Sequence, residues 1–262
     1  MAAAPACGAS SPQDAAPRRF QSFVVVQGES DLWIGWNRSP RETAEFGAAL
    51  KSAAEDALGR LRRDLQNWGT DHGDFFTSLE PLPIPAEAPP VVAAMLKSGR
   101  DAGVGPMAAV AGAIAEMVGN ELRARFGLRE IVVENGGDLF IDVEETLSIS
   151  VYAGLSSFSE KIAIQIDPEL SPCGLACSSG TVGPSLSFGK ADAAAVLAPS
   201  AAAADAWATA LGNRIRTAED LAAALPWVLA VENTLLPGPT GALAILGDRM
   251  AAMGAIRIAP CG

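Results

Sequence analysis

The sequence predicts an α+β protein, in which short strands joined by tight turns occur together with separate helices. The strands are indicated by paired apolar runs, residues 23–26 with 32–36 and residues 131–133 with 139–141, each pair separated by turn-forming residues. The helices are indicated above all by residues 108–122, which are apolar on all sides and rich in small side chains. A helix of this kind is buried, so we expect it to run through the core.

Composition restricts the class of partner. The chain has 262 residues, of which 49% are hydrophobic and 19% charged, so it is long enough to bury a sizeable core. Its net charge of −11 opposes binding to nucleic acid or to an anionic membrane surface. No apolar run approaches the ~20 residues needed to cross a bilayer. We therefore expect a small-molecule ligand, with no nucleic acid and no membrane as partner.

The first 20 residues are rich in Ala, Pro and Ser and have neither the basic start nor the apolar stretch of a signal peptide. We expect residues 1–20 to be a disordered leader, followed by a single domain over residues 21–262 in a cytoplasmic protein. The four cysteines lack the paired spacing of a zinc site or a disulfide framework. They are Cys7, Cys173, Cys177 and Cys261.

The first half of the chain predicts two helices and a long connection. Residues 39–40, Ser and Pro, suit the cap and first turn of a helix. The apolar residues that follow recur at three- and four-residue intervals and predict one buried stripe. They are Phe46, Leu50, Ala54, Ala57, Leu61 and Leu65. Residues 70–90 form the connection, in which a solvated His72 is expected more often than a metal ligand or general base. A second helix begins at residues 91–96 and is interrupted by residues 99–105.

The second half predicts strands from period-two alternation or short apolar runs. They are residues 147–152, 162–166, 174–177, 192–197, 227–231, 242–246 and 255–258. A helix capped by Ser200 is expected from about residue 201 to residue 212, and a short amphipathic helix over residues 217–225. The loop 237–241 fits a hairpin connection between strands.

The central hairpin carries polar groups at its turn. Asn and Gly tolerate the positive φ that a tight turn needs. The turn also places two carboxylates, an amide and two glycines together. The carboxylates could accept hydrogen bonds or hold a cation, and the glycines would let a ligand approach the backbone closely. These residues are Glu134, Asn135, Gly136, Gly137 and Asp138. The alternative is an ordinary hairpin turn with solvated acids.

Two later patterns suit phosphate and a metal ion. A loop with hydroxyls, backbone donors and glycine is what a phosphate cradle requires, although such loops are common. It contains Ser178, Ser179, Gly180 and Thr181. Asp205 and Thr209 lie one helical turn apart and so share a face, where their oxygens would suit Mg²⁺. The alternative is a polar pair on a surface helix.

Glu116 is the acid inside the apolar helix of residues 108–122. It could face solvent, pair with a basic residue, or be a buried carboxylate directed at a site. The sequence leaves these three alternatives open.

Residues 196–211, VLAPSAAAADAWATAL, resemble the strand-to-helix motif of the ApbE family of FAD:protein FMN transferases. In that family an apolar strand ends in APS and the helix carries ADAxATAL, whose Asp and Thr hold the Mg²⁺ that engages the FAD diphosphate. The resemblance therefore assigns Mg²⁺ to Asp205 and Thr209. Residues 110–115 fall where the family has an IAKGYA helix, whose alanine carbonyl is a further metal ligand. In this chain that residue is Ala111. The implied fold is ApbE-like, with antiparallel strands flanked by helices.

Two more segments resemble family motifs. The turn Gly136-Gly137-Asp138 is similar to the family's GGD turn, and residues 178–181 are similar to its TSGD loop. The resemblance implies that the turn of residues 134–138 contacts the nucleotide and that the loop donates to phosphate. The matching motifs occur in the family's order from about Gly105 to Gly212. Their sequences resemble those of a non-secreted branch of the superfamily.

The chain departs from the family pattern at three places. The family's lysine in the core helix is Gly112, and the acid of its TSGD loop is Thr181. Its HxxxDP segment has no counterpart, because residues 183–190 contain no histidine. These departures favour binding of a metal-bridged diphosphate without phosphoryl transfer.

The leading hypothesis is a Mg²⁺-dependent protein that binds FAD or a related flavin nucleotide and transfers FMN, or another phosphoryl group, to a protein acceptor. Either Asp138 or Glu116 would act as base, and the sequence does not select one. One alternative is a flavin- or nucleotide-binding protein without chemistry. Another is an interaction module that retains only the scaffold. The oligomeric state and the acceptor are not indicated.

Overall fold

The computed structural model describes residues 19–37, 44–181, 188–231 and 234–261. Eight strands form one antiparallel sheet in the order β1-β2-β3-β4-β7-β8-β9-β10. They are β1 (Phe20–Gln27), β2 (Ser30–Asn37), β3 (Ile131–Asn135), β4 (Asp138–Asp142), β7 (Cys173–Ser178), β8 (Ala193–Ala198), β9 (Gly241–Leu246) and β10 (Arg249–Gly254). A second antiparallel sheet has the order β11-β6-β5. It contains β5 (Leu147–Ser150), β6 (Ile162–Ile166) and β11 (Arg257–Pro260).

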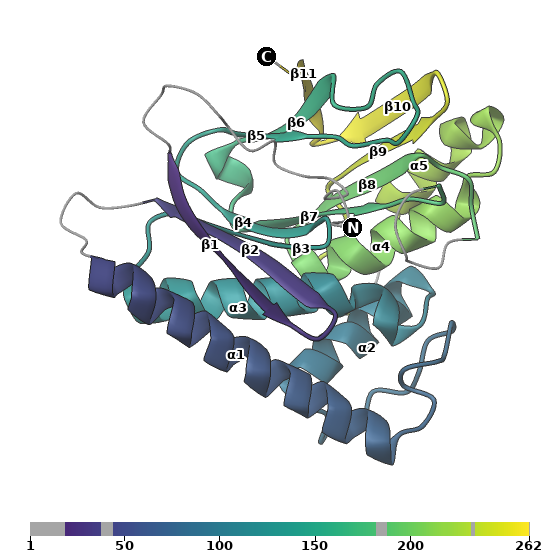
Figure 1. The fold of residues 1–262 in the computed structure, drawn as a ribbon. Helices are drawn as coiled ribbons and strands as arrows, with labels where there is room; N and C mark the ends of the chain where they lie inside the picture. The colour runs from purple at the N-terminus through teal and green to yellow at the C-terminus, as the bar shows by residue number, and fades with distance from the viewer. Residues whose placement is uncertain (1–18, 38–43, 182–187, 232–233, 262) are drawn as a thin grey trace.

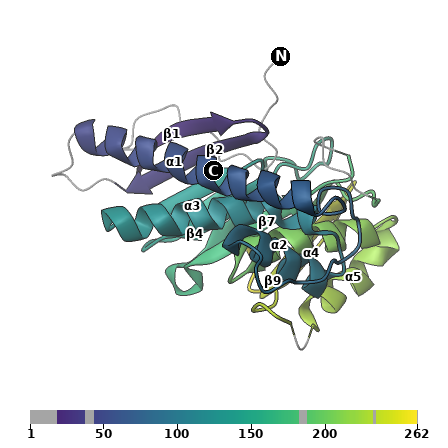
Figure 2. The ribbon, with the colours of Figure 1, turned by 90° about the horizontal axis from the view of Figure 1, so that it is seen from below.

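Five α-helices cover one face of the large sheet, and the small sheet covers part of the other (Figures 1 and 2). The helices are α1 (Ala44–Asp71), α2 (Pro90–Ala102), α3 (Val110–Phe126), α4 (Ala201–Arg214) and α5 (Leu221–Leu229). Three short 3₁₀ turns also occur in the described residues: η1 (Pro106–Ala109) between α2 and α3, η2 (Pro168–Leu170) between β6 and β7, and η3 (Ala218–Asp220) between α4 and α5. The α+β class with antiparallel strands and flanking helices is confirmed.

Strand alternation divides the apolar residues between two cores. On β3, Ile131 and Val133 pack with the helices, whereas Val132 packs with the small sheet. Because successive side chains on a strand point to opposite faces, Asn135 lies on the helix side and Glu134 on the other. This alternation decides which residues of the central hairpin can meet a helix.

The predicted helices are largely confirmed. Within the stripe of α1, Leu50, Ala54, Ala57 and Leu65 are buried, and Phe46 and Leu61 are partly buried against the same core. The predicted cap at residues 39–40 lies outside the described residues. The second helix continues through Gly99 and ends at Gly103, which has a φ of 70°. A glycine is needed at residue 99, because a Cβ there would lie 2.8 Å from the carbonyl oxygen of Val104.

The prediction of a strand over residues 227–231 is wrong. Residues 227–229 continue α5 past Pro226, although a proline usually ends a helix. Tertiary packing explains the difference, because the Trp227 ring lies 5.4 Å from that of Trp207 and the Arg214 guanidinium lies 3.5 Å from its centre. The loop 237–241 therefore connects a helix to β9, and the hairpin partner of β9 is β10, which the sequence patterns did not predict.

Within the described residues no single helix is long and apolar enough to cross a membrane. The segments Pro90–Ala102 and Pro106–Phe126 meet that test only as a pair, which is bent by 105°.

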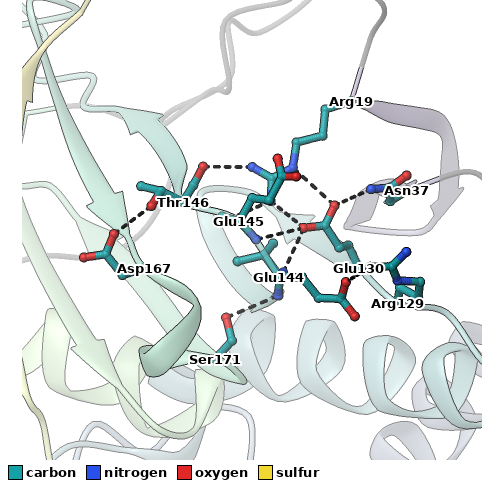
Figure 3. A network of polar contacts seen from close by, with 10 residues as sticks. Arg19, Asn37, Arg129, Glu130, Glu144, Glu145, Thr146, Asp167 and Ser171 are labelled. Atoms are coloured by element: carbon teal, nitrogen blue, oxygen red, sulfur yellow. Dashed lines mark hydrogen bonds and ion pairs between the residues drawn. The ribbon is translucent and has the colours of Figure 1, made fainter.

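A buried carboxylate, Glu130, joins three strand ends at one edge of the structure (Figure 3). Its oxygens accept hydrogen bonds from Arg19 at 2.5 Å and from Asn37 at 2.6 Å. They also accept the backbone N–H groups of Glu144 at 2.8 Å and Glu145 at 3.3 Å. The start of β1, the end of β2 and the loop after β4 are thereby held together. Residue 19 and the first residue of β1 both lie inside the segment that the sequence assigned to the leader.

Burial acts to raise the pKa of Glu130, but the hydrogen bonds from Arg19, Asn37 and the Glu144 N–H outweigh it and lower the pKa to about 2. A carboxyl whose pKa falls on folding contributes stability above its unfolded pKa of about 4.5. That contribution is lost as the pH falls toward 2.

We predict that Glu130→Gln lowers the free energy of unfolding by about 2–4 kcal/mol at pH 7, because it leaves Arg19 facing a neutral partner. In urea titrations between pH 7 and pH 3, the difference from the wild type should shrink once the pH falls below about 4.5. Glu145→Gln changes an exposed side chain of the same loop and should be neutral. A difference that stays the same at pH 7 and pH 3 would contradict this account.

Candidate functional site

The site is built where α3 and α4 approach each other most closely. A Cβ on Gly112 of α3 would lie 2.1 Å from the carbonyl oxygen of Ala201 in α4, and a Cβ on Gly174 of β7 would lie 2.2 Å from the Ala201 Cα. Neither glycine can therefore carry a side chain without displacing α4. The two glycines set the position of α4 against both α3 and the sheet.

Each of these two helices supplies a carboxylate to the first turn of the other. The Asp205 Oδ2 atom on α4 accepts the backbone N–H of Gly112 at 2.9 Å. In return, the Glu116 Oε2 atom on α3 accepts the Ser200 hydroxyl at 2.7 Å and the Ala202 N–H at 3.2 Å. Since the first N–H groups of a helix have no partner inside it, both carboxylates act as caps and favour the positive end of the helix dipole. The order of these contacts makes α3 and α4 antiparallel.

Asp205 is partly buried at this junction. Burial raises its pKa to about 7, and the N–H groups of Gly112 and Ala111 act in the opposite direction. A carboxylate that has lost water and is only partly compensated by two N–H groups is well suited to a cation.

One face of α4 runs from this junction to the end of β7. Asp205, Thr209 and Gly212 occur at intervals of four and three residues and so share that face. Asp205 and Thr209 are partly buried among fully buried neighbours. At the far end, a Cβ on Gly212 would lie 3.3 Å from the Ser178 Oγ atom. Thr209 thus lies between the first turn of α3 and Ser178.

The central hairpin reaches the same place through Asn135. Its Nδ2 atom donates to the carbonyl oxygen of Ala111 at 3.2 Å, next to the N–H group that Asp205 accepts. Asp138 lies directly opposite Asn135 in the β3–β4 pair and therefore on the same face of the sheet. The structure thus brings together Ala111, Asn135 and Asp205, and the strand register puts Asp138 on the same face of the sheet as Asn135.

The turn itself differs from the prediction in one detail. The positive φ angles belong to Gly136 at 66° and Gly137 at 105°, so Asn135 remains in the strand. This arrangement frees the Asn135 amide to contact α3.

Glu134 is separated from the other turn residues, because it lies on the sheet face away from the helices. Burial raises its pKa to about 7, the nearby carboxylate of Asp31 adds to this effect, and the Gly137 N–H opposes it. A ligand held by Asp205 on the helix side would not meet this side chain.

Most of the polar groups in the loop of residues 178–181 form hydrogen bonds within the protein. The Gly180 N–H donates to the carbonyl of Ala191 at 2.8 Å, and the Thr181 N–H donates to the Ser179 hydroxyl at 3.1 Å. The Thr181 hydroxyl donates to Asp192 at 3.0 Å. Ser178 is the member of the loop that faces α4.

The donor set at Asp205 fits magnesium better than a transition metal. Among the described residues no group of three or more His, Cys, Asp and Glu side chains could hold a metal ion. Mg²⁺ does not need one, because it commonly takes one or two carboxylates and fills its remaining positions with water and phosphate oxygens. The Ala111 carbonyl oxygen accepts a hydrogen bond from Asn135, so a metal ion bound to this oxygen would share it with that amide.

The reciprocal capping was not predicted. Its signal in the sequence is an acid four residues after each contact residue, Gly112 to Glu116 and Ala201 to Asp205, on two helices of small side chains. Without knowledge that these helices are neighbours, the spacing has no structural meaning.

We predict that Gly112→Ala destabilises the protein by at least about 2 kcal/mol, because the added methyl group would overlap the Ala201 carbonyl. Gly73→Ala is the matched control, since a Cβ there would meet nothing within 4 Å. Urea unfolding would measure both variants. Equal stability of the two would mean that α3 and α4 are not in close contact at Gly112.

Comparison with known proteins agrees with this architecture. A family model described as "AbpE bacteria" matches residues 13–231. A UPF0280 protein of Methanosphaerula palustris is 40% identical over 237 residues, covering 90% of this chain and 88% of that protein. A UPF0280 protein of Methanocella arvoryzae is 41% identical over 199 residues, covering 76% and 78%.

Among solved structures, the apo form of the flavinyl transferase ApbE from Pseudomonas stutzeri superimposes with a TM-score of 0.51 at 15% identity. The alignment covers 90% of this chain and 94% of that one, and it shows a shared fold. From the family match and the similarity to the UPF0280 proteins, this chain belongs to the AbpE bacteria family, and its fold is that of the ApbE flavin transferases.

Proposed function

We propose that this protein binds FAD or a related flavin nucleotide together with Mg²⁺, with Asp205 and Thr209 as its side-chain ligands to the ion. The observation that carries the proposal is the placement of the Asp205 carboxylate, partly buried against the first turn of α3. The name flavinyl transferase belongs to a structural neighbour and supports the choice of nucleotide.

Electrostatics support the requirement for a cation. The first turn of a helix attracts anions, but Asp205 already occupies this one at α3. A diphosphate that approached Asp205 would meet a carboxylate in a protein of net charge −11. A divalent cation between the two anions removes this repulsion. Bound there, Mg²⁺ would also neutralise charge on the leaving phosphate.

The neighbouring residues have separate proposed roles. Asn135 orients the start of α3 through the Ala111 carbonyl, and Ser178 offers a hydroxyl near the end of α4. Asp138 lies on the same sheet face and is the candidate base for transfer of FMN to a protein acceptor. Glu116 is a weaker candidate, because its carboxylate caps α4.

One observation favours a second function, binding without chemistry. The family's lysine is replaced by Gly112, and the contact with Ala201 leaves no room for any side chain there. A site without this cation would hold the nucleotide more readily than it would catalyse transfer. The cytoplasmic location remains a prediction from the sequence.

We predict that FAD binding depends on Mg²⁺ and that Asp205→Asn weakens it by at least about tenfold. Asn keeps an oxygen that can accept the Gly112 N–H, so the fold should be retained while the charge is lost. Flavin fluorescence titrations with Mg²⁺ or with EDTA would measure the affinity. Asp56→Asn, on the exposed face of α1, is the control and should bind like the wild type.

The reaction products distinguish transfer of FMN from binding without chemistry. Release of AMP, with FMN attached to an acceptor peptide, supports transfer, and Mg²⁺-dependent binding without AMP supports the non-catalytic function. If FAD does not bind at all, or binds Asp205→Asn as tightly as the wild type, the proposed site is wrong. An interaction module would then be the better description.

A further inference from the structure

A cavity of about 230 Å³ lies apart from Asp205, between the end of α1, the connection to α2, and α2 itself. Rings form much of its lining. The lining residues are Trp68, His72, Gly73, Asp74, Phe75, Leu82, Pro83, Pro85 and Leu96. None of them belongs to α3, α4 or the β3–β4 turn. An engineered apolar cavity of about 150 Å³ is enough to bind benzene, so this one has room for a six-membered ring with a short side chain.

The wall formed by Trp68 and His72 is well defined. Their rings stack 3.7 Å apart and within 9° of parallel. The His72 Nδ1 atom also lies 3.0 Å from the Trp68 carbonyl oxygen, which fixes the imidazole over the indole. The chain's single histidine is exposed, as expected for a solvated loop residue, and its ring also forms part of the cavity wall.

The charges of the segment that connects α1 to α2 have one sign. The segment from Asp71 to Pro90 carries four carboxylates and contains neither Lys nor Arg. Asp74 is the charged member of the lining and is exposed. Among the described residues no ion pair neutralises its carboxylate. The Asp74 carboxylate would therefore repel an anionic ligand and attract a cation, which the ring faces would also attract.

We propose that this cavity binds a small organic cation that carries one aromatic ring on a short alkylamine. The ring packs among Trp68, Phe75 and the two prolines, and the ammonium group lies at the mouth beside Asp74. This binding site is independent of the flavin nucleotide at Asp205.

Three probes of equal ring size test the proposal: phenethylamine, 2-phenylethanol and phenylacetate. In ligand-observed NMR titrations of the full chain at pH 8, phenethylamine should bind about fivefold more tightly than the alcohol. Phenylacetate should bind most weakly. Equal affinity for the three probes, or no binding of phenethylamine, would overturn the proposal.

Two variants locate the site. Asp74→Asn should remove the preference for the amine over the alcohol, and Glu80→Gln, in the same loop but outside the lining, should preserve it. Leu82→Trp should fill the cavity and abolish binding of all three probes. If that variant does not fold, Leu82→Phe should weaken all three together. Unchanged binding in a folded Leu82 variant would show that the probes bind elsewhere.

Discussion

The close contact of α3 with α4 at Gly112 is the constraint on which the candidate site depends. Because a glycine faces Ala201 there, the two helices can exchange carboxylate caps, Asp205 for the start of α3 and Glu116 for the start of α4. The exchange stabilises two helix ends that the core would otherwise bury without partners. It also places one carboxylate, Asp205, beside the face of the sheet that carries Asn135 and Asp138. A stabilising contact and a candidate ligand site are therefore made by the same side chain.

The length of strand β3 separates this site from the Glu130 network. Glu130 precedes β3, whereas the Gly136-Gly137 turn follows it, so the two features lie at opposite ends of the same strand. Fixing one end through Arg19 and Asn37 restricts the register and direction of β3. The other end can then present Asn135 to α3 with a defined geometry.

Local patterns predicted the class of fold and most of the elements, because strand alternation and helix periodicity report burial directly. They failed at residues 227–231, where the packing of Trp227 on Trp207 extends a helix past Pro226. The grouping of Asp205 with Ala111 and the glycine turn came from resemblance to a family and not from spacing. The structure adds what neither provided, namely that Glu134 faces away, that Glu116 is a cap, and that His72 stacks on Trp68. Each of these depends on which elements are neighbours, and local sequence does not encode that.

The central claim is that Asp205, held at the first turn of α3, is the place where this protein binds a divalent cation. Mn²⁺ prefers the same oxygen ligands as Mg²⁺ and gives an anomalous X-ray signal, so crystals grown with FAD and Mn²⁺ test the claim most directly. We predict an anomalous peak in contact with the Asp205 carboxylate, on the side that faces Thr209. A peak at another carboxylate, with Asp205 still bonded only to the Gly112 N–H, would contradict it.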